Sequence, residues 1–256
     1  MSQSSDPPRA EIRPLVEIMA RLRDPLNGCA WDVQQDFKSV APYTIEEAYE
    51  VADACARDDM AALKDELGDL LLQVVFHSRM AQERGAFSVD DVITSICDKM
   101  VRRHPHVFGP EGSEPDWEGI KAAERSGKDD DGSAVAGIAL ALPALMRAEK
   151  LQKRAARTGF DWPDPSGARK KIDEELAEFE AAVSADARED EMGDILFSVV
   201  NLARKANIDP EVALRRANAK FEQRFRAVEV MGGAGFSRMQ LHEMEMLWQA
   251  AKLTVV

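Results

Sequence analysis

The chain carries one arrangement of acidic residues twice, and this arrangement constrains the fold more than any other feature. Each copy has the form Glu-Glu-x-x-Glu, followed after a short gap by Glu-x-Gly-Asp. On an α-helix, residues three or four apart share a face, so a helical hairpin would bring four carboxylates together. The four in the first copy are Glu47, Glu50, Glu66 and Asp69, and the four in the second copy are Glu175, Glu178, Glu191 and Asp194.

The surroundings of these residues are repeated as well. The stretch from Glu66 to Arg79 shares Glu, Gly, Asp, Leu, Val, Val and Arg with the stretch from Glu191 to Arg204, at an offset of 125 residues. Upstream, Gly28-Cys-Ala-Trp31 matches Gly159-Phe-Asp-Trp162. The chain is therefore expected to be a tandem repeat of one domain.

Composition and periodicity predict an all-α fold. Apolar residues recur at helical spacing after each acidic pair, as in Leu67, Leu71 and Val74, and alternating strand patterns are almost absent. We expect two tandem helical domains with cores of the four-helix-bundle type. The polar stretch 126–133 separates the halves. The predicted organisation is a disordered tail at 1–12, a first domain at 13–125, a linker at 126–136 and a second domain at 137–256.

Charge and cysteine content narrow the classes of function. The formal net charge is −13, which disfavours binding to a nucleic-acid backbone. The three cysteines are widely spaced, which argues against a disulfide framework or a zinc site and for a reducing compartment. No secretion signal or membrane-length apolar run is evident, so we expect a cytoplasmic protein without membrane contact.

Four converging carboxylates are expected to hold a divalent cation. Their mutual repulsion would otherwise raise their pKa values. Hard oxygen ligands favour Mg²⁺, Mn²⁺ or Ca²⁺ over Zn²⁺, and we expect Mg²⁺, with Mn²⁺ as an alternative. A di-iron site would need Glu-x-x-His, but Asp69 and Asp194 occupy the relevant positions. The alternative for a single glutamate is a solvated helix face. In the first copy, Thr44-Ile-Glu-Glu47 also has the form of a capping box, which predicts a helix start near Thr44.

Basic and aromatic residues at helical spacing are candidate substrate ligands, since Mg²⁺ usually shares its shell with substrate phosphates. Two of them, Lys171 and Arg188, precede glutamates of the second copy by about one turn. A solvated basic face, or a core position for the tryptophan, is the alternative interpretation. The six candidates are Lys171, Arg188, Lys220, Arg224, Trp248 and Lys252.

Several further stretches resemble the MazG family of all-α nucleoside triphosphate pyrophosphohydrolases, and the resemblance spans roughly residues 14 to 252. The acidic pattern itself is the signature of these enzymes. The other stretches that carry the resemblance are Ile18–Asp32, Ala41–Thr44, Arg102–Phe108, Leu142–Ala148, Gly159–Trp162 and Lys220–Arg226.

The resemblance implies Mg²⁺-dependent hydrolysis of a nucleoside triphosphate to the monophosphate and pyrophosphate. It implies that Glu175, Glu178, Glu191 and Asp194 are metal ligands. It also implies that Lys220 and Arg224 hold phosphates and that Trp248 and Lys252 lie near the nucleotide. It also implies a homodimer in which helices of two chains complete the bundles, and a role in removing aberrant nucleotides. Among the neighbouring carboxylates, Glu174 is our candidate for the proton acceptor.

The two copies are expected to be unequal. The position of Lys171 is taken by Tyr43 in the first copy, and that of Arg188 by Leu63. The first copy therefore lacks two positive charges that a polyphosphate would attract. We predict that the second copy holds the main catalytic site, and that the first is a narrower site or a dimerisation element.

Two other functions remain open at this stage. One is hydrolysis restricted to dUTP or phosphoribosyl-ATP on a similar scaffold, against which the tandem architecture counts. The other is a nucleotide-sensing or partner-binding helical protein, with a regulatory metal site and a regulatory protein partner. Intact acidic sets beside Lys and Arg favour turnover over binding alone.

Overall fold

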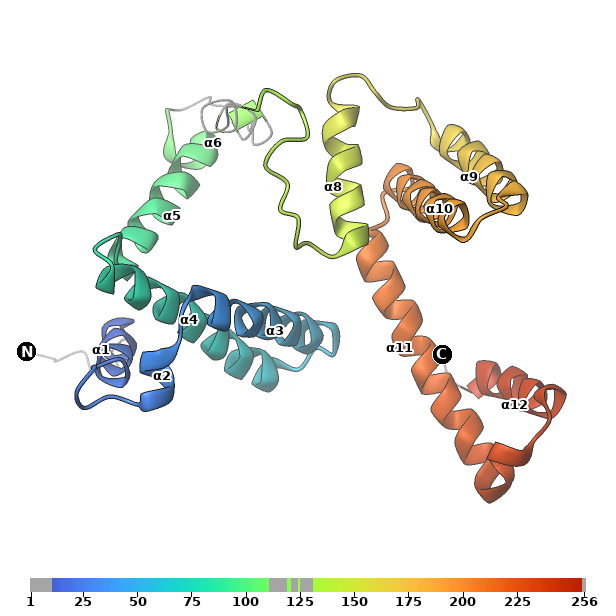
Figure 1. Cartoon of the computed structure of the whole chain (residues 1–256), viewed down its shortest axis with the longest axis horizontal. Helices are drawn as coiled ribbons and strands as arrows, with labels where there is room; N and C mark the ends of the chain where they lie inside the picture. The colour runs from blue at the N-terminus through green and yellow to red at the C-terminus, as the bar shows by residue number, and fades with distance from the viewer. Residues whose placement is uncertain (1–10, 111–118, 121–123, 125–130, 255–256) are drawn as a thin grey trace, which may run out of the picture. The chain divides into compact units, whose positions relative to one another are not determined.

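The computed structural model describes residues 11–110, 119–120, 124 and 131–254, and within these ranges every regular element is helical (Figure 1). This confirms the predicted all-α class. The chain divides into two compact units, Met1–Ala122 and Ala123–Val256. The predicted tail and linker lie outside the described residues, apart from 11–12 and 131–136. No helix of the described part is long and apolar enough to cross a membrane.

Unit 1 is built around a hairpin of two long helices, α3 and α4, which lie side by side (Figure 1). Helix α1 packs across α4. The buried core between these helices contains Met19, Val40, Val75, Phe76 and Met80. The helices of this unit are α1 (Arg13–Leu22), α2 (Ala30–Gln34), α3 (Phe37–Ala56), α4 (Met60–Glu83), α5 (Val89–Arg103) and α6 (Pro105–Phe108).

The prediction that a helix starts near Thr44 is wrong. Helix α3 begins seven residues earlier, at Phe37, because the Asp36 side chain accepts hydrogen bonds from the backbone N–H groups of Lys38 and Ser39. The Ser39 hydroxyl in turn accepts the Asp36 N–H, which completes a capping box. Thr44 lies inside the helix, so capping does not account for the glutamates that follow it.

Unit 2 repeats the hairpin with α9 and α10, again side by side (Figure 1). Asp164 and Ser184 cap the N-termini of these two helices through their side-chain oxygens. Helix α8 packs on α10 as α1 packs on α4, while α11 pairs chiefly with α12. The helices of this unit are α8 (Ala144–Ala156), α9 (Pro165–Ala181), α10 (Ala185–Lys205), α11 (Pro210–Gly232), α12 (Leu241–Thr254) and the short 3₁₀ helix η1 (Gly233–Arg238).

The apolar residues of α4 and α10 lie on two faces of each helix, one buried and one partly exposed. Val75 and its repeat counterpart Val200 are buried, as the helical spacing predicts. A second stripe on the same helices stays between 38% and 51% exposed in one chain. Such a continuous apolar stripe is typical of a surface that another helix covers. Its members are Leu67, Leu71 and Val74 on α4 and Met192, Leu196 and Val199 on α10.

Candidate metal and nucleotide site

The second acidic set converges at the α9–α10 hairpin of unit 2. One carboxylate oxygen each of Glu175, Glu178 and Glu191 lies within 4.8 Å of the others. Asp194 lies one turn beyond Glu191 on α10 and is close enough to raise its pKa. The structure therefore brings together the four residues that the helical spacing predicts.

The electrostatics of this cluster show the effect of crowding like charges. Desolvation, followed by the charges of Glu175 and Asp194, raises the pKa of Glu191. The hydrogen bond that Glu178 shares with Glu175, followed by desolvation, raises the pKa of Glu178. Carboxylates that repel one another in this way are suited to binding a hard divalent cation, which would offset the repulsion.

Lys171, a predicted substrate ligand, contacts the acidic cluster directly. Its ammonium lies 2.6 Å from Glu175 Oε1 and 2.7 Å from Glu174 Oε1. Hydrogen bonds to these two carboxylates raise the pKa of Lys171, and the bond from Lys171 lowers the pKa of Glu175. The Glu175 side chain is only 4% exposed, whereas that of Glu174 is 56% exposed. The candidate proton acceptor thus lies at the rim of the cluster, on the solvent side.

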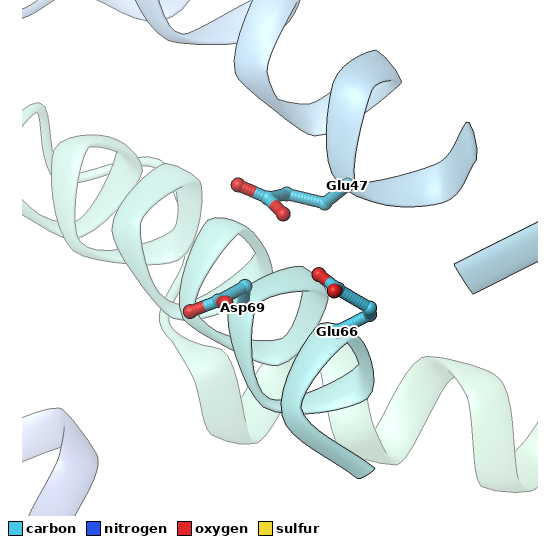
Figure 2. Close-up of side chains that lie close together, drawn as sticks. All are labelled: Glu47, Glu66 and Asp69. Atoms are coloured by element: carbon cyan, nitrogen blue, oxygen red, sulfur yellow. The ribbon is translucent and has the colours of Figure 1, made fainter. Parts of the chain in front are cut away.

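The first acidic set forms a similar cluster in unit 1. Figure 2 shows Glu47 reaching from α3 towards Glu66 and Asp69 on α4, and carboxylate oxygens of the three lie within 4.8 Å of one another. Desolvation is the largest cause that raises the pKa values of Glu47 and Glu66, and Glu50 raises both further. All four predicted ligands of this copy therefore interact. The place of Lys171 is taken by Tyr43, which packs edge-on against Trp31.

A pocket of about 770 Å³ opens beside the acidic cluster of unit 2. Its wall includes Glu175 of the cluster, Lys171, which pairs with Glu175, and Asp194. A cavity of this size accommodates a nucleotide-sized ligand. Polar and aromatic side chains of α8, α10 and the loop between α8 and α9 also line the wall. Among them are Gln152, Ser198, Asn201, Phe160 and Trp162.

Sequence reasoning missed these wall residues. Phe160 and Trp162 belong to the repeated motif Gly159-Phe-Asp-Trp162, but an aromatic residue in such a motif does not by itself indicate a binding role. Gln152 and Asn201 carried no signal, because single polar residues in amphipathic helices are ordinary. Gln152 is buried and donates from its amide to the Phe197 carbonyl at 2.8 Å, which fixes its orientation in the wall.

In unit 1, a buried aromatic residue takes the place of one residue of the pocket wall. At the offset of 125 residues, Asn201 corresponds to Phe76, which is buried in the core beside Met19. The cavity found in unit 1 is smaller, about 410 Å³, and its wall runs from α1 to the start of α5. None of that unit's four acidic ligands, all of which the structure describes, lines it. In unit 2, by contrast, the 770 Å³ pocket includes Glu175 of the acidic cluster in its wall.

Comparison with known proteins agrees with the doubled architecture. Residues 35–108 and 165–228 each match the model of the MazG nucleotide pyrophosphohydrolase domain. The chain belongs to the MazG family. It is similar to the nucleoside triphosphate pyrophosphohydrolase of Escherichia coli K12, with 49% identity over 94% of this chain and 97% of that protein. It is also similar to the nucleoside triphosphate pyrophosphohydrolase/pyrophosphatase MazG of Thermotoga maritima, with 45% identity over 93% of this chain and 94% of that protein.

Four other predicted ligands of this MazG-family chain lie on α11 and α12, and none of the four, all of them in the described part of the chain, lines the unit 2 pocket. Trp248 packs against Phe221, with ring centroids 5.2 Å apart, so within one chain it joins the two helices. The four residues are Lys220, Arg224, Trp248 and Lys252.

The last predicted ligand, Arg188, has a contact of its own near the hairpin turn. Its Nε donates to the Ala182 carbonyl at 3.1 Å, at the end of α9. This bond satisfies a carbonyl at a helix C-terminus, where a positive charge is also favourable. Arg188 therefore helps to hold the turn that joins the two acid-bearing helices.

Asp161 anchors the loop that carries Phe160 and Trp162. Its carboxylate accepts hydrogen bonds from Arg204 at 2.5 and 3.0 Å and from Lys205 at 3.2 Å. These contacts, chiefly the hydrogen bonds from Arg204, lower the pKa of Asp161 to about 2. The ion pairs tie the loop to the end of α10 and so fix one side of the pocket.

Proposed function

We propose that this chain hydrolyses nucleoside triphosphates to the nucleoside monophosphate and pyrophosphate with Mg²⁺, and that unit 2 holds the principal site. The carrying observation is that the 770 Å³ pocket is lined by Glu175 of the acidic cluster, together with Lys171, which pairs with Glu175, and Asp194, which acts on Glu191. A triphosphate bound in this pocket would have its phosphates against the acidic cluster. The names of the two full-length relatives support the same activity.

The residues proposed to hold the cation are Glu175, Glu178, Glu191 and Asp194. When bound, Mg²⁺ supplies Lewis-acid polarisation of phosphate oxygens and activation of water. Glu174 is the proposed proton acceptor, since it lies at the solvent-facing rim of the cluster. Lys171 is proposed to contact a phosphate, where its charge offsets charge developing on the leaving pyrophosphate. Phe160 and Trp162 are proposed to face the nucleobase.

A homodimer is part of the proposal. Unpartnered apolar stripes on α4 and α10 support it, because exposed stripes of this kind are suited to burial by a second copy. A second chain would also provide a route by which Lys220, Arg224, Trp248 and Lys252 reach a pocket that they do not line in their own chain. The acidic set of unit 1 is proposed as a second metal site, and the chain as a cytoplasmic enzyme that removes aberrant nucleotides.

The direct test is pyrophosphate release from canonical nucleoside and deoxynucleoside triphosphates and dUTP, with Mg²⁺ and with EDTA. We expect turnover of several substrates that EDTA abolishes. Glu178→Gln should reduce turnover by at least about a hundredfold, whereas Glu50→Gln should leave most of it. Full activity of Glu178→Gln with a dead Glu50→Gln would reverse the assignment of the sites. Turnover of dUTP alone would favour the narrower hydrolase, and no turnover of any substrate would favour a nucleotide-binding protein.

A further inference from the structure

The ammonium of Lys171 lies among the carboxylates that are proposed to hold the cation. It is within 2.6 Å of Glu175 Oε1 and within 2.7 Å of Glu174 Oε1, and its own side chain is 34% exposed. Glu175 is the most buried member of the cluster, so its charge is the one that most needs a partner. In this arrangement, Lys171 neutralises it.

The repeat shows that this lysine is not needed to build the hairpin. In unit 1, the α3–α4 hairpin brings Glu47, Glu66 and Asp69 within the same 4.8 Å with Tyr43 at the corresponding position. Helix packing alone therefore suffices to gather the carboxylates. This comparison points to a role of Lys171 in the charge balance of unit 2 rather than in the assembly of its helices.

A lysine and a divalent cation compete for such a site. The Glu175 oxygen that accepts a short hydrogen bond from Lys171 is also a natural oxygen ligand for Mg²⁺. Two positive charges a few ångströms apart repel each other, so the cation gains affinity if the ammonium withdraws. Lys171 has room to withdraw, because it also lines the pocket and is partly exposed.

We propose that Lys171 is a displaceable counter-ion, which holds Glu175 until a divalent cation enters and then turns into the pocket to contact a phosphate. This inference rests on the proposed function of the unit 2 site. It makes the binding of cation and nucleotide mutually reinforcing, since each favours the state in which Lys171 has left Glu175. The charge of the lysine is used twice, first to neutralise Glu175 and then to hold the substrate.

The test compares Lys171→Met with Lys170→Met in the full chain. Lys170 is the adjacent, exposed lysine and controls for the loss of one positive charge from α9. Both changes are made in a Glu50→Gln/Glu66→Gln background, which disables the cluster of unit 1. Mn²⁺ binding without nucleotide is followed by the electron paramagnetic resonance signal of the free ion. Binding of α,β-methylene-dATP, which resists cleavage at that bridge, is then measured at saturating Mn²⁺.

We expect Lys171→Met to bind Mn²⁺ about tenfold more tightly than the parent, because a competing charge is gone. The same variant should bind the nucleotide analogue about tenfold more weakly, whereas Lys170→Met changes both by less than about twofold. Opposite signs on the two ligands are the signature of displacement. If Lys171 were only a structural support, Lys171→Met would weaken the binding of both Mn²⁺ and the analogue.

Unchanged or weaker Mn²⁺ binding by Lys171→Met overturns the proposal, as does loss of helical circular dichroism, which would make Lys171 structural. Lys171→Gln must give the same signs as Lys171→Met. The proposed function is judged separately, by pyrophosphate release from the parent chain. Turnover without the change in Mn²⁺ affinity refutes the counter-ion role alone, and the affinity change without turnover refutes the hydrolase alone.

Discussion

Replacing Asp161 by Asn should destabilise unit 2 by a predictable amount. The ordinary pKa of an aspartate is near 3.8, and the contacts with Arg204 and Lys205 lower that of Asp161 to about 2. This difference corresponds to about 2.4 kcal/mol of folding free energy at neutral pH. Because solvent at the protein surface screens part of the interaction, we expect Asp161→Asn to cost about 1–2 kcal/mol.

The pH dependence of this cost has a definite sign. The folded-state pKa of Asp161 is depressed, so its contribution is complete above the unfolded-state value near 3.8 and is lost as the pH falls towards 2. The difference in unfolding free energy between the parent and Asp161→Asn should therefore be constant from pH 7 to pH 5. It should have fallen to about half by pH 3. Urea unfolding followed by circular dichroism measures it at each pH.

An exposed ion pair in the same unit provides the control. Asp173 pairs with Arg169 one turn away on α9, and both side chains are 58% exposed. Such pairs contribute about 0.3–0.5 kcal/mol, so Asp173→Asn should cost far less than Asp161→Asn. Equal costs for the two variants, or a difference that grows on acidification, would contradict the assignment of Asp161 as a strongly paired anchor.

Two other consequences concern packing. Met19 is 1% exposed in the core of unit 1, so Met19→Ala should lower the stability of that unit by about 2–5 kcal/mol, measured by urea unfolding, while pyrophosphate release by the folded chain persists. Leu196→Asp, in the apolar stripe of α10, should convert the proposed dimer to a monomer in light scattering. Val183→Asp, at a fully exposed turn position, should not, and a dimer that survives Leu196→Asp would exclude this stripe from the interface.

The helical class, the repeat and the convergence of the carboxylates could all be predicted from the sequence, because each depends on spacing within one or two neighbouring helices. The start of α3 was misplaced because two capping signals compete. Thr44 with Glu47 matches the usual pattern, but Asp36 with Ser39 forms the cap that the structure uses. The upstream pair prevails because Asp36 satisfies two backbone N–H groups where the extended chain turns into the helix.

The pocket of unit 2 could not be predicted in this way. It depends on how α8 packs across α10, and this packing places Gln152 and Asn201 in one wall. The sequence periodicity of α8 and of α10 does not predict how the two helices pack on each other. The same limit applies to Lys220 and Trp248, whose helical spacing was evident but whose place relative to the acidic cluster is set by tertiary contacts.

The difference between the two copies can be tested at a single position. Asn201 lines the pocket of unit 2, and its counterpart Phe76 fills the core of unit 1, although carboxylates converge in both units. Asn201→Phe should therefore fill part of the pocket with an aromatic ring. We expect binding of a nucleotide analogue to fall by at least about tenfold, because an occupied cavity cannot bury the ligand, while Mn²⁺ binding stays within about twofold.

Asn201→Ala is the matched control for this change. It removes the same contact with Arg204 but leaves the pocket open, so it should bind the analogue much better than Asn201→Phe. Analogue binding by Asn201→Phe at the parent's affinity would show that the nucleotide lies elsewhere. Equal losses of affinity for Mn²⁺ and for the analogue would show instead that the pocket wall and the acidic cluster cannot be altered independently. The predicted separation follows from unit 1, where a filled core and a converged acidic cluster coexist in one fold.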